Sequence, residues 1–254
     1  MSIESTDDLI GLQRAGRVVA LALEAMRRFV RPGVTTGELD AAGEAVFSRF
    51  GARSAPQLAY GFPGVNCISL NDEAVHGVPS PTRLIRRGDL VKIDVTAERD
   101  DYMADAAITV EAGAWTAPKQ RLIRAARAAL DEGLQAALPG SPINLVGRAV
   151  EREVRRRGFS VIRELAGHGI GRTIHESPTV PNYCDPRQCG SLTEGLVLTI
   201  EPIIAAGVGA VRRPLEDGWT LSTSDGGLSA HVEHTIVIAK DRPLVLTGLP
   251  PTAT

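Results

Sequence analysis

The sequence predicts an α/β domain in which two halves, related by an internal duplication, contribute antiparallel strands. The first observation is a repeat, because Pro32–Gly33 recurs 107 positions later as Pro139–Gly140, and further glycines recur at the same displacement. The second is that apolar residues at helical spacing precede each copy. The third is that a β-rich run ending in an acidic residue follows each copy. We therefore expect helices and strands in the same order in both halves.

Two helices are expected in each half. Apolar side chains recur at helical spacing over residues 7–30 and again over residues 120–137. Each run stops before a Pro-Gly pair, which suits a helix terminus. A second helix is expected near residues 36–49 in the first half and 143–157 in the second, and each ends at a repeated glycine.

Two strands follow the helices in each half. Residues 88–94 align with residues 195–201, and both runs end in a carboxylate. Residues 105–110 likewise resemble residues 233–238. A polar turn at residues 98–101 joins the first two strands, so we expect them to be antiparallel neighbours.

The repeat also predicts the domain organisation. We expect one domain over residues 1–254, with repeats at roughly 7–115 and 116–240. The strand pair of the second half is more widely spaced than that of the first. We therefore expect an insertion around residues 207–228, a stretch rich in glycine and charge.

Composition argues against two classes of partner. The chain carries 28 basic and 30 acidic side chains, a formal charge of −2, and lacks the basic excess typical of nucleic-acid binders. It has no run of about 18 apolar residues, so we expect no membrane contact. The N-terminus lacks a signal-peptide pattern and the cysteine count of three is odd, which predicts reduced thiols and a cytoplasmic location.

Four acidic residues are expected to lie in strands that are otherwise apolar. A carboxylate buried there without a partner would cost several kcal/mol or become protonated. Four of them brought together by the duplication would also repel one another, so a cation must compensate. The four residues are Asp94, Asp105, Glu201 and Glu233.

Two kinds of cation could supply this charge. Arginine could pair with any one of the four carboxylates, but no arginine recurs beside them in the strands. Divalent metal is the more economical explanation, and oxygen-rich ligation favours Mn, Fe or Co over structural zinc. Four carboxylates suit two ions that share bridging ligands.

Histidine usage agrees with a metal site. His168 lies in the glycine-rich segment 167–171, where flanking glycines let the backbone bend and bring an imidazole close to a metal. His175 follows seven positions later. His231 and His234 are interpreted as ordinary satisfied side chains.

Several short segments and single residues follow one another along nearly the whole chain: CISLNDEAVHGVP at 67–79, Asp94, Asp105, GHGIG at 167–171, His175, TIEP at 199–202 and LSAHVEHT at 228–235. Together, and in this order, they resemble type I methionine aminopeptidases. The resemblance implies the pita-bread fold, with a curved antiparallel sheet flanked by helices around a dinuclear metal site. One departure is His231, where a glutamine is usual in that family.

The resemblance implies a role for each metal ligand. Asp94 matches a chelating ligand of one ion, and Asp105 and Glu233 match the carboxylates that bridge both ions. His168 and Glu201 match the remaining ligands of the other ion. The implied cofactors are two divalent ions, Co, Mn or Fe, which would lower the pKa of the attacking water.

The resemblance also implies the catalytic and substrate-binding residues. His76 and His175 match a pair that contacts the substrate, and His175 would donate to the developing oxyanion. Glu201 is also a candidate for moving the proton to the leaving amine. The expected methionine pocket is lined by Phe62, Cys67, His76, His175 and Trp219.

Two positions near this pocket depart from the family. The family segment Tyr-x-Gly-Phe/Tyr-Pro stands here as AYGFP at 59–63, so that Tyr60 comes one place late. Either one aromatic wall is lost, or Tyr60 swings in and fills the same space. Ile174 stands where an aromatic residue or leucine is common.

The implied function is removal of the N-terminal methionine from nascent polypeptides whose second residue is small. We expect a cytoplasmic monomer, and a contact with the ribosome is left open. Proline-specific aminopeptidases and prolidases share the fold, but they usually carry a large extra N-terminal domain. A binding protein without metal would be expected to have lost ligands, and all five ligand positions are present here.

Overall fold

The structure, a computed structural model, describes residues 1–212, 214 and 216–248. Its helices are α1 (Thr6–Phe29), α2 (Thr36–Phe50), α3 (Ala55–Tyr60), α4 (Ala117–Ala136) and α5 (Ile143–Arg156). The strands of the first half are β1 (Arg53–Ser54), β2 (Cys67–Leu70), β3 (Glu73–Val75), β4 (Leu90–Arg99) and β5 (Tyr102–Glu111). Those of the second half are β6 (Ser160–Val161), β7 (Ala166–Gly169), β8 (Glu176–Pro181), β9 (Val197–Ile200), β10 (Ile203–Ala205), β11 (Leu221–Ser222), β12 (Ser229–His231), β13 (His234–Val237) and β14 (Leu244–Val245).

The predicted α/β class and the four long helices are confirmed. Helix α2 ends at Gly51, which adopts the left-handed conformation with φ 65° that residues with a Cβ rarely adopt. Helix α4 begins at Ala117, three residues before its apolar repeat, because Pro118 in its first turn is compatible with a helix start. The single-domain span and the repeat limits stay predictions. They include residues 213, 215 and 249–254, which lie outside the described part of the chain.

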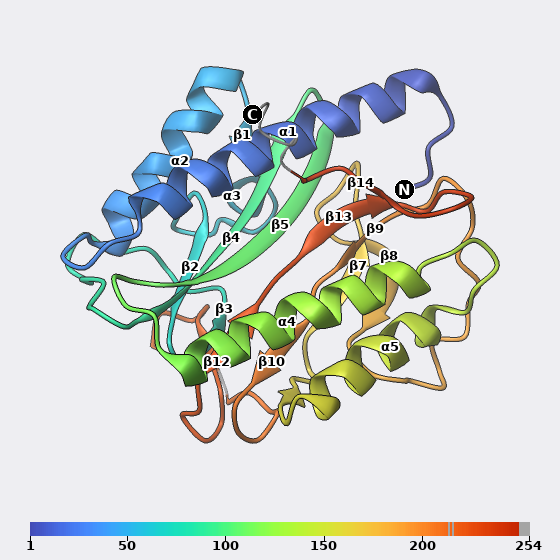
Figure 1. Ribbon diagram of the computed structural model, residues 1–254. Coiled ribbons are helices and arrows are strands. Elements are labelled where there is room, and N and C mark those ends of the chain that lie inside the picture. The colour runs from blue at the N-terminus through green and yellow to red at the C-terminus, as the bar shows by residue number, and fades with distance from the viewer. Residues whose placement is uncertain (213, 215, 249–254) are drawn as a thin grey trace, which may run out of the picture.

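The two halves place their helices on a curved antiparallel framework (Figure 1). In the first half, α1 packs over the long β4–β5 hairpin, which β2 and β1 extend through β4, and α2 packs against α1 and contacts β1 and β2. In the second half, α4 and α5 pack together beside the sheet β14-β13-β9-β7-β8. No helix in the described residues has the length and apolar character needed to span a bilayer.

The register of the β4–β5 hairpin brings its two acidic residues to one face of the sheet. Thr96 lies opposite Asp105, and Asp94 lies opposite Ala107, two residues further along β5. Side chains two residues apart on a strand share a face, so Asp94 and Asp105 are diagonal neighbours across the ladder. The predicted antiparallel pairing is therefore confirmed.

Hydrogen bonds between β5 and the segment 231–235 join the two halves. The Asp105 N–H donates to Thr235 Oγ1 (2.8 Å), and that hydroxyl donates back to the Asp105 carbonyl (2.7 Å). The Glu233 N–H donates to the Ala107 carbonyl at 3.0 Å. These bonds fix the backbones of Asp105 and Glu233 next to each other, although 128 positions separate them in the sequence.

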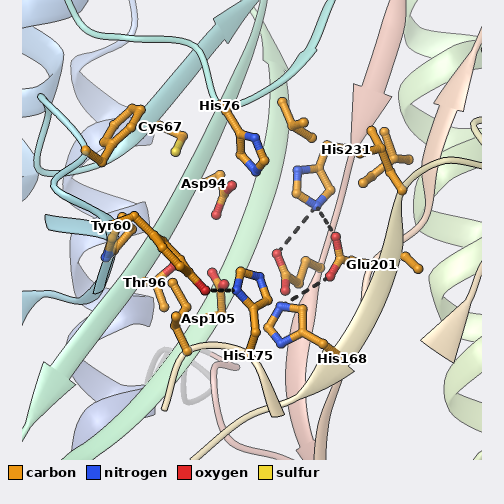
Figure 2. A pocket seen from close by; sticks show the side chains of 18 of the residues that line it. Tyr60, Cys67, His76, Asp94, Thr96, Asp105, His168, His175, Glu201 and His231 are labelled. Carbon is orange, nitrogen blue, oxygen red and sulfur yellow. Dashed lines mark hydrogen bonds and ion pairs between the residues drawn. The ribbon is translucent and has the colours of Figure 1, made fainter. Parts of the chain in front are cut away.

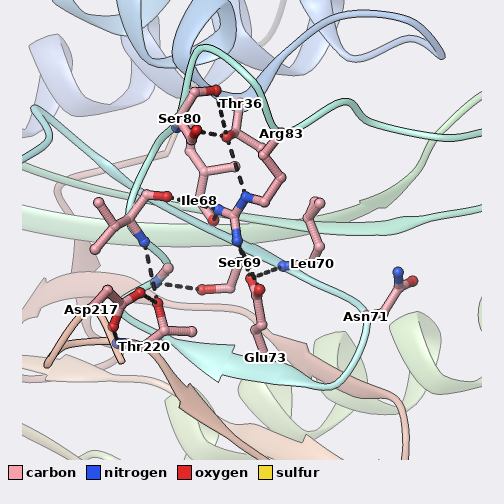
Figure 3. A network of polar contacts seen from close by, with 12 residues as sticks. Thr36, Ile68, Ser69, Leu70, Asn71, Glu73, Ser80, Arg83, Asp217 and Thr220 are labelled. Carbon is pink, nitrogen blue, oxygen red and sulfur yellow. Dashed lines mark hydrogen bonds and ion pairs between the residues drawn. The ribbon is translucent and has the colours of Figure 1, made fainter. Parts of the chain in front are cut away.

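An arginine supports the segment that carries His76 (Figure 3). Arg83 donates to both carboxylate oxygens of Glu73 (2.7 and 2.9 Å) and to the carbonyls of Ile68 (2.6 Å) and Val78 (3.0 Å). These acceptors lie on both sides of His76 in the sequence. The Arg83 guanidinium therefore holds together the two sides of the segment that carries His76 into the cavity lining.

We expect Arg83→Ala to lower the free energy of unfolding by about 2–3 kcal/mol, because half-buried Glu73 and two carbonyls would lose their donor. Urea unfolding measures the loss. The matched control is Arg212→Ala, since Arg212 forms a long, exposed pair with Asp72 (3.5 Å) and should contribute less than about 1 kcal/mol. Equal losses in the two variants would contradict a bracing role for Arg83.

Candidate active site and metal centre

One cavity of about 330 Å³ contains every site residue that the sequence predicted (Figure 2). First-half and second-half side chains face one another across it. Those from the first half are Phe62, Cys67, His76, Asp94 and Asp105, and those from the second half are His168, His175, Glu201, Trp219 and Glu233.

The four carboxylates occupy two kinds of position. Asp94 and Asp105 lie inside β4 and β5, as expected. Glu201 instead directly follows β9, and Glu233 directly precedes β13, so these two lie at strand ends. An acid at a strand end is free of the strict alternation of the pleat, and both glutamates can turn toward the aspartates.

The carboxylates are held in an unfavourable electrostatic environment. Desolvation raises the pKa of Asp105, Glu201 and Glu233 well above the usual range, and the neighbouring carboxylates raise these pKa values further. Burial also raises the pKa of Asp94. Among residues 1–212, 214 and 216–248, no lysine or arginine forms an ion pair with any of the four.

The donor atoms fit a divalent cation. Within the described part of the chain, Asp105 Oδ1 and Glu233 Oε1 are buried without a hydrogen-bond partner, although buried polar atoms are normally satisfied. Asp105, His168 and Glu233 offer ligand atoms that all lie within 4.8 Å of one another, and so do Glu201, His231 and Glu233. Carboxylate oxygens with imidazole nitrogens suit Mn, Fe or Co.

His168 is oriented with one ring nitrogen toward the carboxylates. Its Nδ1 lies 2.9 Å from the Gly169 carbonyl, and its Nε2 lies 3.6 Å from Glu201 Oε1. Burial and the neighbouring His175 lower the pKa of His168 to about 4. A neutral ring whose Nδ1–H donates to a carbonyl leaves the Nε2 lone pair available to a metal.

The glycines around His168 allow close backbone packing instead of the backbone bend that was expected. Gly167 and Gly169 lie in β7, where a Cβ on either would collide with the carbonyl of Thr199 or of Ser177. A register irregularity between His168 and Gly169 re-aims the imidazole within the strand. The glycines therefore allow close packing of neighbouring backbones around a β-bulge.

The two substrate-side histidines approach from different elements. His76 has a positive φ of 58°, an uncommon conformation for a residue with a side chain, and it lines the cavity. The His175 ring lies 4.3 Å from the His168 ring, centroid to centroid. Burial lowers the pKa of His175, which favours the neutral ring.

Tyr60 is a site residue whose contact the sequence did not predict. Its hydroxyl lies 2.5 Å from His175 Nδ1, so it reaches the cavity from the end of α3 (Figure 2). Of the two alternatives for this segment, the one in which Tyr60 swings in describes the observed geometry. Ala59 is exposed, and Ile174 lines the cavity.

His231 lies much closer to the carboxylates than an ordinary core side chain would. Its Nε2 is 3.4 Å from Glu233 Oε2 and 3.7 Å from Glu201 Oε2. The spacing of two residues between His231 and Glu233 was the available signal, because residues two apart in extended backbone share a face.

An apolar wall adjoins the carboxylates. Phe62 and Trp219 meet edge to face with their ring centroids 5.3 Å apart, and Phe62 is buried. Cys67 is also buried and lies opposite Asp94 in the β2–β4 register. The cavity therefore combines a group of carboxylates with an apolar wall of aromatic rings and a sulfur atom, which suits the binding of an apolar side chain.

Known proteins are similar to this chain in sequence and in fold. "Methionine aminopeptidase 2" of Bacillus subtilis (strain 168) is 44% identical over 250 residues, which cover 98% of this chain and 100% of that protein. The crystal structure of methionine aminopeptidase from Thermotoga maritima superposes with a TM-score of 0.94 at 34% identity, covering 98% of this chain and all of that one. This match confirms the pita-bread fold.

A prolidase from Pyrococcus furiosus superposes with a TM-score of 0.77 at 23% identity, and the match covers 98% of this chain but 66% of the prolidase. That likeness shows a shared fold. Residues 11–240, most of the chain, match metallopeptidase family M24. The chain therefore belongs to metallopeptidase family M24.

Proposed function

We propose that this chain is a type I methionine aminopeptidase, which hydrolyses the bond after an N-terminal methionine when the second residue is small. The observation that carries the proposal is a group of four carboxylates, three buried and one half-buried, that lie beside an apolar cavity and have no basic partner in the described part of the chain. The 44% identity to a Bacillus subtilis methionine aminopeptidase supports the same reaction.

Five side chains would hold two divalent ions. Asp94 would chelate one ion, Asp105 and Glu233 would bridge both, and His168 and Glu201 would complete the other. When bound, the ions act as Lewis acids that polarise the scissile carbonyl and lower the pKa of the attacking water. The donor set suits Co, Mn or Fe.

His175 and Tyr60 would act together on the reacting carbonyl. The Tyr60 hydroxyl lies 2.5 Å from His175 Nδ1 and would donate to it, which would leave the proton of the neutral ring on Nε2. That N–H donates to the oxyanion as negative charge develops, where a fixed donor has its greatest effect. His76 contacts the substrate from the opposite wall, and Glu201 moves a proton to the leaving amine.

The apolar wall would select the first side chain. Cys67 lies on the side of the cavity away from His168 (Figure 2), and the paired rings of Phe62 and Trp219 also line the cavity. Sulfur–aromatic contacts favour a thioether, so methionine should be preferred to leucine. A misfit of one methylene changes binding by only about 1–3 kcal/mol, so the preference should be clear without being absolute.

The partners would be the N-termini of nascent polypeptides in the cytoplasm. The protein would act on them as a monomer. The pocket is built for one N-terminal side chain, and the formal charge of −2 gives no basic surface excess for nucleic acid. Contact with the ribosome is left open.

A tripeptide panel tests the function. The metal-free protein should be inactive, and Mn, Co or Fe should restore cleavage of Met-Ala-Ser faster than of Leu-Ala-Ser or of Gly-Pro peptides. Asp105→Ala should abolish turnover, because a bridging ligand serves both ions. Full activity without metal, or faster cleavage of leucyl or prolyl peptides, would contradict the proposal.

The stability of the protein should respond to metal more strongly at higher pH. The pKa values of Asp105, Glu201 and Glu233 are raised, so these three carboxyls contribute most to the stability of the metal-free protein when they are protonated, below their unfolded pKa of about 4. That stability is lost as the pH rises through the folded pKa values. Bound cations remove this penalty, and they need deprotonated ligands.

We therefore expect a larger Co(II)-induced rise in Tm at pH 7.5 than at pH 5.5, measured by thermal unfolding. Asp105→Asn is the control, because it removes one buried charge. It should raise the Tm of the metal-free protein at pH 7.5 and weaken the metal response. Equal metal shifts at both pH values would count against a carboxylate metal centre.

Tyr60 and His175 can be tested as a pair. His175→Ala should lower kcat roughly 10²–10³-fold with metal content unchanged, the scale of losing one oxyanion donor. Tyr60→Phe should lower kcat about threefold to tenfold, the effect of one hydrogen bond, and should have no further effect when added to His175→Ala. Independent losses in the double variant, or loss of metal in His175→Ala, would contradict these roles.

A further inference from the structure

His231 is the buried histidine that none of the roles above uses. It ends β12, only 3% of its side chain is exposed, and its Nε2 has no hydrogen-bond partner among the residues that the structure describes. That nitrogen lies 3.4 Å from Glu233 Oε2 and 3.7 Å from Glu201 Oε2. A buried nitrogen placed between two carboxylates needs a partner that the surrounding protein atoms do not supply.

The backbone of His231 is fixed by Thr109 of β5. The His231 N–H donates to Thr109 Oγ1 at 2.9 Å, and the Thr109 hydroxyl donates to the His231 carbonyl at 2.7 Å. β12 also pairs with β10, so that Ile203 lies opposite His231. With its backbone held from both halves, the imidazole keeps its direction toward Glu201 and Glu233 (Figure 2).

The distances match those between ligands of one ion. Two donor atoms about 2.1 Å from an ion, at about 90–120° to each other, lie about 3.0–3.6 Å apart. The separation of His168 Nε2 from Glu201 Oε1 is 3.6 Å, and the two contacts of His231 Nε2 span 3.4–3.7 Å. His231 thus stands to the carboxylates as His168 does.

We propose that His231 is a sixth protein ligand, whose Nε2 binds the ion that Glu201, Glu233 and His168 would hold. The ligand atoms of Glu201, His231 and Glu233 all lie within 4.8 Å of one another. The proposal rests on the dinuclear centre proposed above. It concerns the position where related enzymes usually carry glutamine, whose amide is a weaker ligand than imidazole.

The competing role for His231 is donation of an Nε2–H hydrogen bond to one carboxylate. Both contacts are longer than the 2.7–2.9 Å typical of a bond between a donor and a carboxylate. The ring nitrogen lies within 3.7 Å of two carboxylate oxygens instead of being aligned on one at hydrogen-bond distance, which suits an ion between them. The two roles differ in whether the ring is bonded to the metal, and that difference can be measured directly.

The experiment counts imidazoles bound to Co(II) by proton NMR of the full-length protein loaded with two equivalents of metal. Ring protons of a histidine on this paramagnetic ion shift far outside the ordinary range. We expect two sets of shifted imidazole resonances, of which His168→Gln and His231→Gln each lose one. The matched control is His234→Gln, because its Nδ1 lies 2.8 Å from Thr247 Oγ1, and this variant should keep both sets.

Calorimetric titration gives a second readout. The affinity of His231→Gln for one of its two ions should fall at least about tenfold, whereas that of His234→Gln should match the native protein. An unchanged affinity in His231→Gln would overturn direct ligation.

A single set of shifted resonances in the native protein, lost in His168→Gln, would also overturn the proposal and leave His231 as a hydrogen-bond donor. That outcome is measured on the native protein and on His168→Gln, so it does not depend on whether a His231 variant folds. The proposed peptidase function would survive it, because cobalt would still be bound. Failure of the native protein to bind cobalt at all would instead overturn the dinuclear centre and the proposed function together.

Discussion

Mutual repulsion among four clustered carboxylates is the constraint on which the rest of the structure depends. Desolvation raises the pKa of all four, and neighbouring carboxylates raise the pKa of Asp105, Glu201 and Glu233 further. No basic side chain in the described residues pairs with them. Lys92, two residues before Asp94 on β4, donates instead to the carbonyls of Asn71 (2.8 Å) and Ser229 (3.4 Å). Hydrogen bonds between β5 and residues 231–235, made by backbone amides and by the hydroxyls of Thr109 and Thr235, hold the acids together.

Much of this could be predicted from sequence, because the informative patterns are local or repeated. Helical spacing located the long helices to within a few residues, since one apolar face must pack on the strands. Apolar strands interrupted by acids marked Asp94 and Asp105, and the repeat carried the pattern to Glu201. All ten predicted site residues then line a single cavity, although their individual roles stay predictions.

What the sequence could not supply is the direction of side chains that meet across the two halves. The Tyr60 hydroxyl reaches His175, 115 positions away, from the end of a six-residue helix, and no local pattern encodes that distance. His231 faces Glu201 because β12 pairs with β10 and is bonded to Thr109. Both are properties of tertiary register. The glycines beside His168 show the same limit, since their purpose is set by the carbonyls of Thr199 and Ser177 on neighbouring strands.

The division of the cavity between the halves explains why a duplicated framework suits this chemistry. Each half contributes five of the ten predicted residues, so neither half holds a complete ligand set or a complete pocket. Asp105 and Glu233 come from different halves and are joined through hydrogen bonds of 2.7–3.0 Å between β5 and residues 233–235. Because the two bridging carboxylates come from different halves, the affinity for metal depends directly on how the two halves are placed relative to each other. Any change that shifts β13 against β5 moves the two carboxylates apart and the apolar wall away from His175, so metal binding and substrate positioning should be lost together.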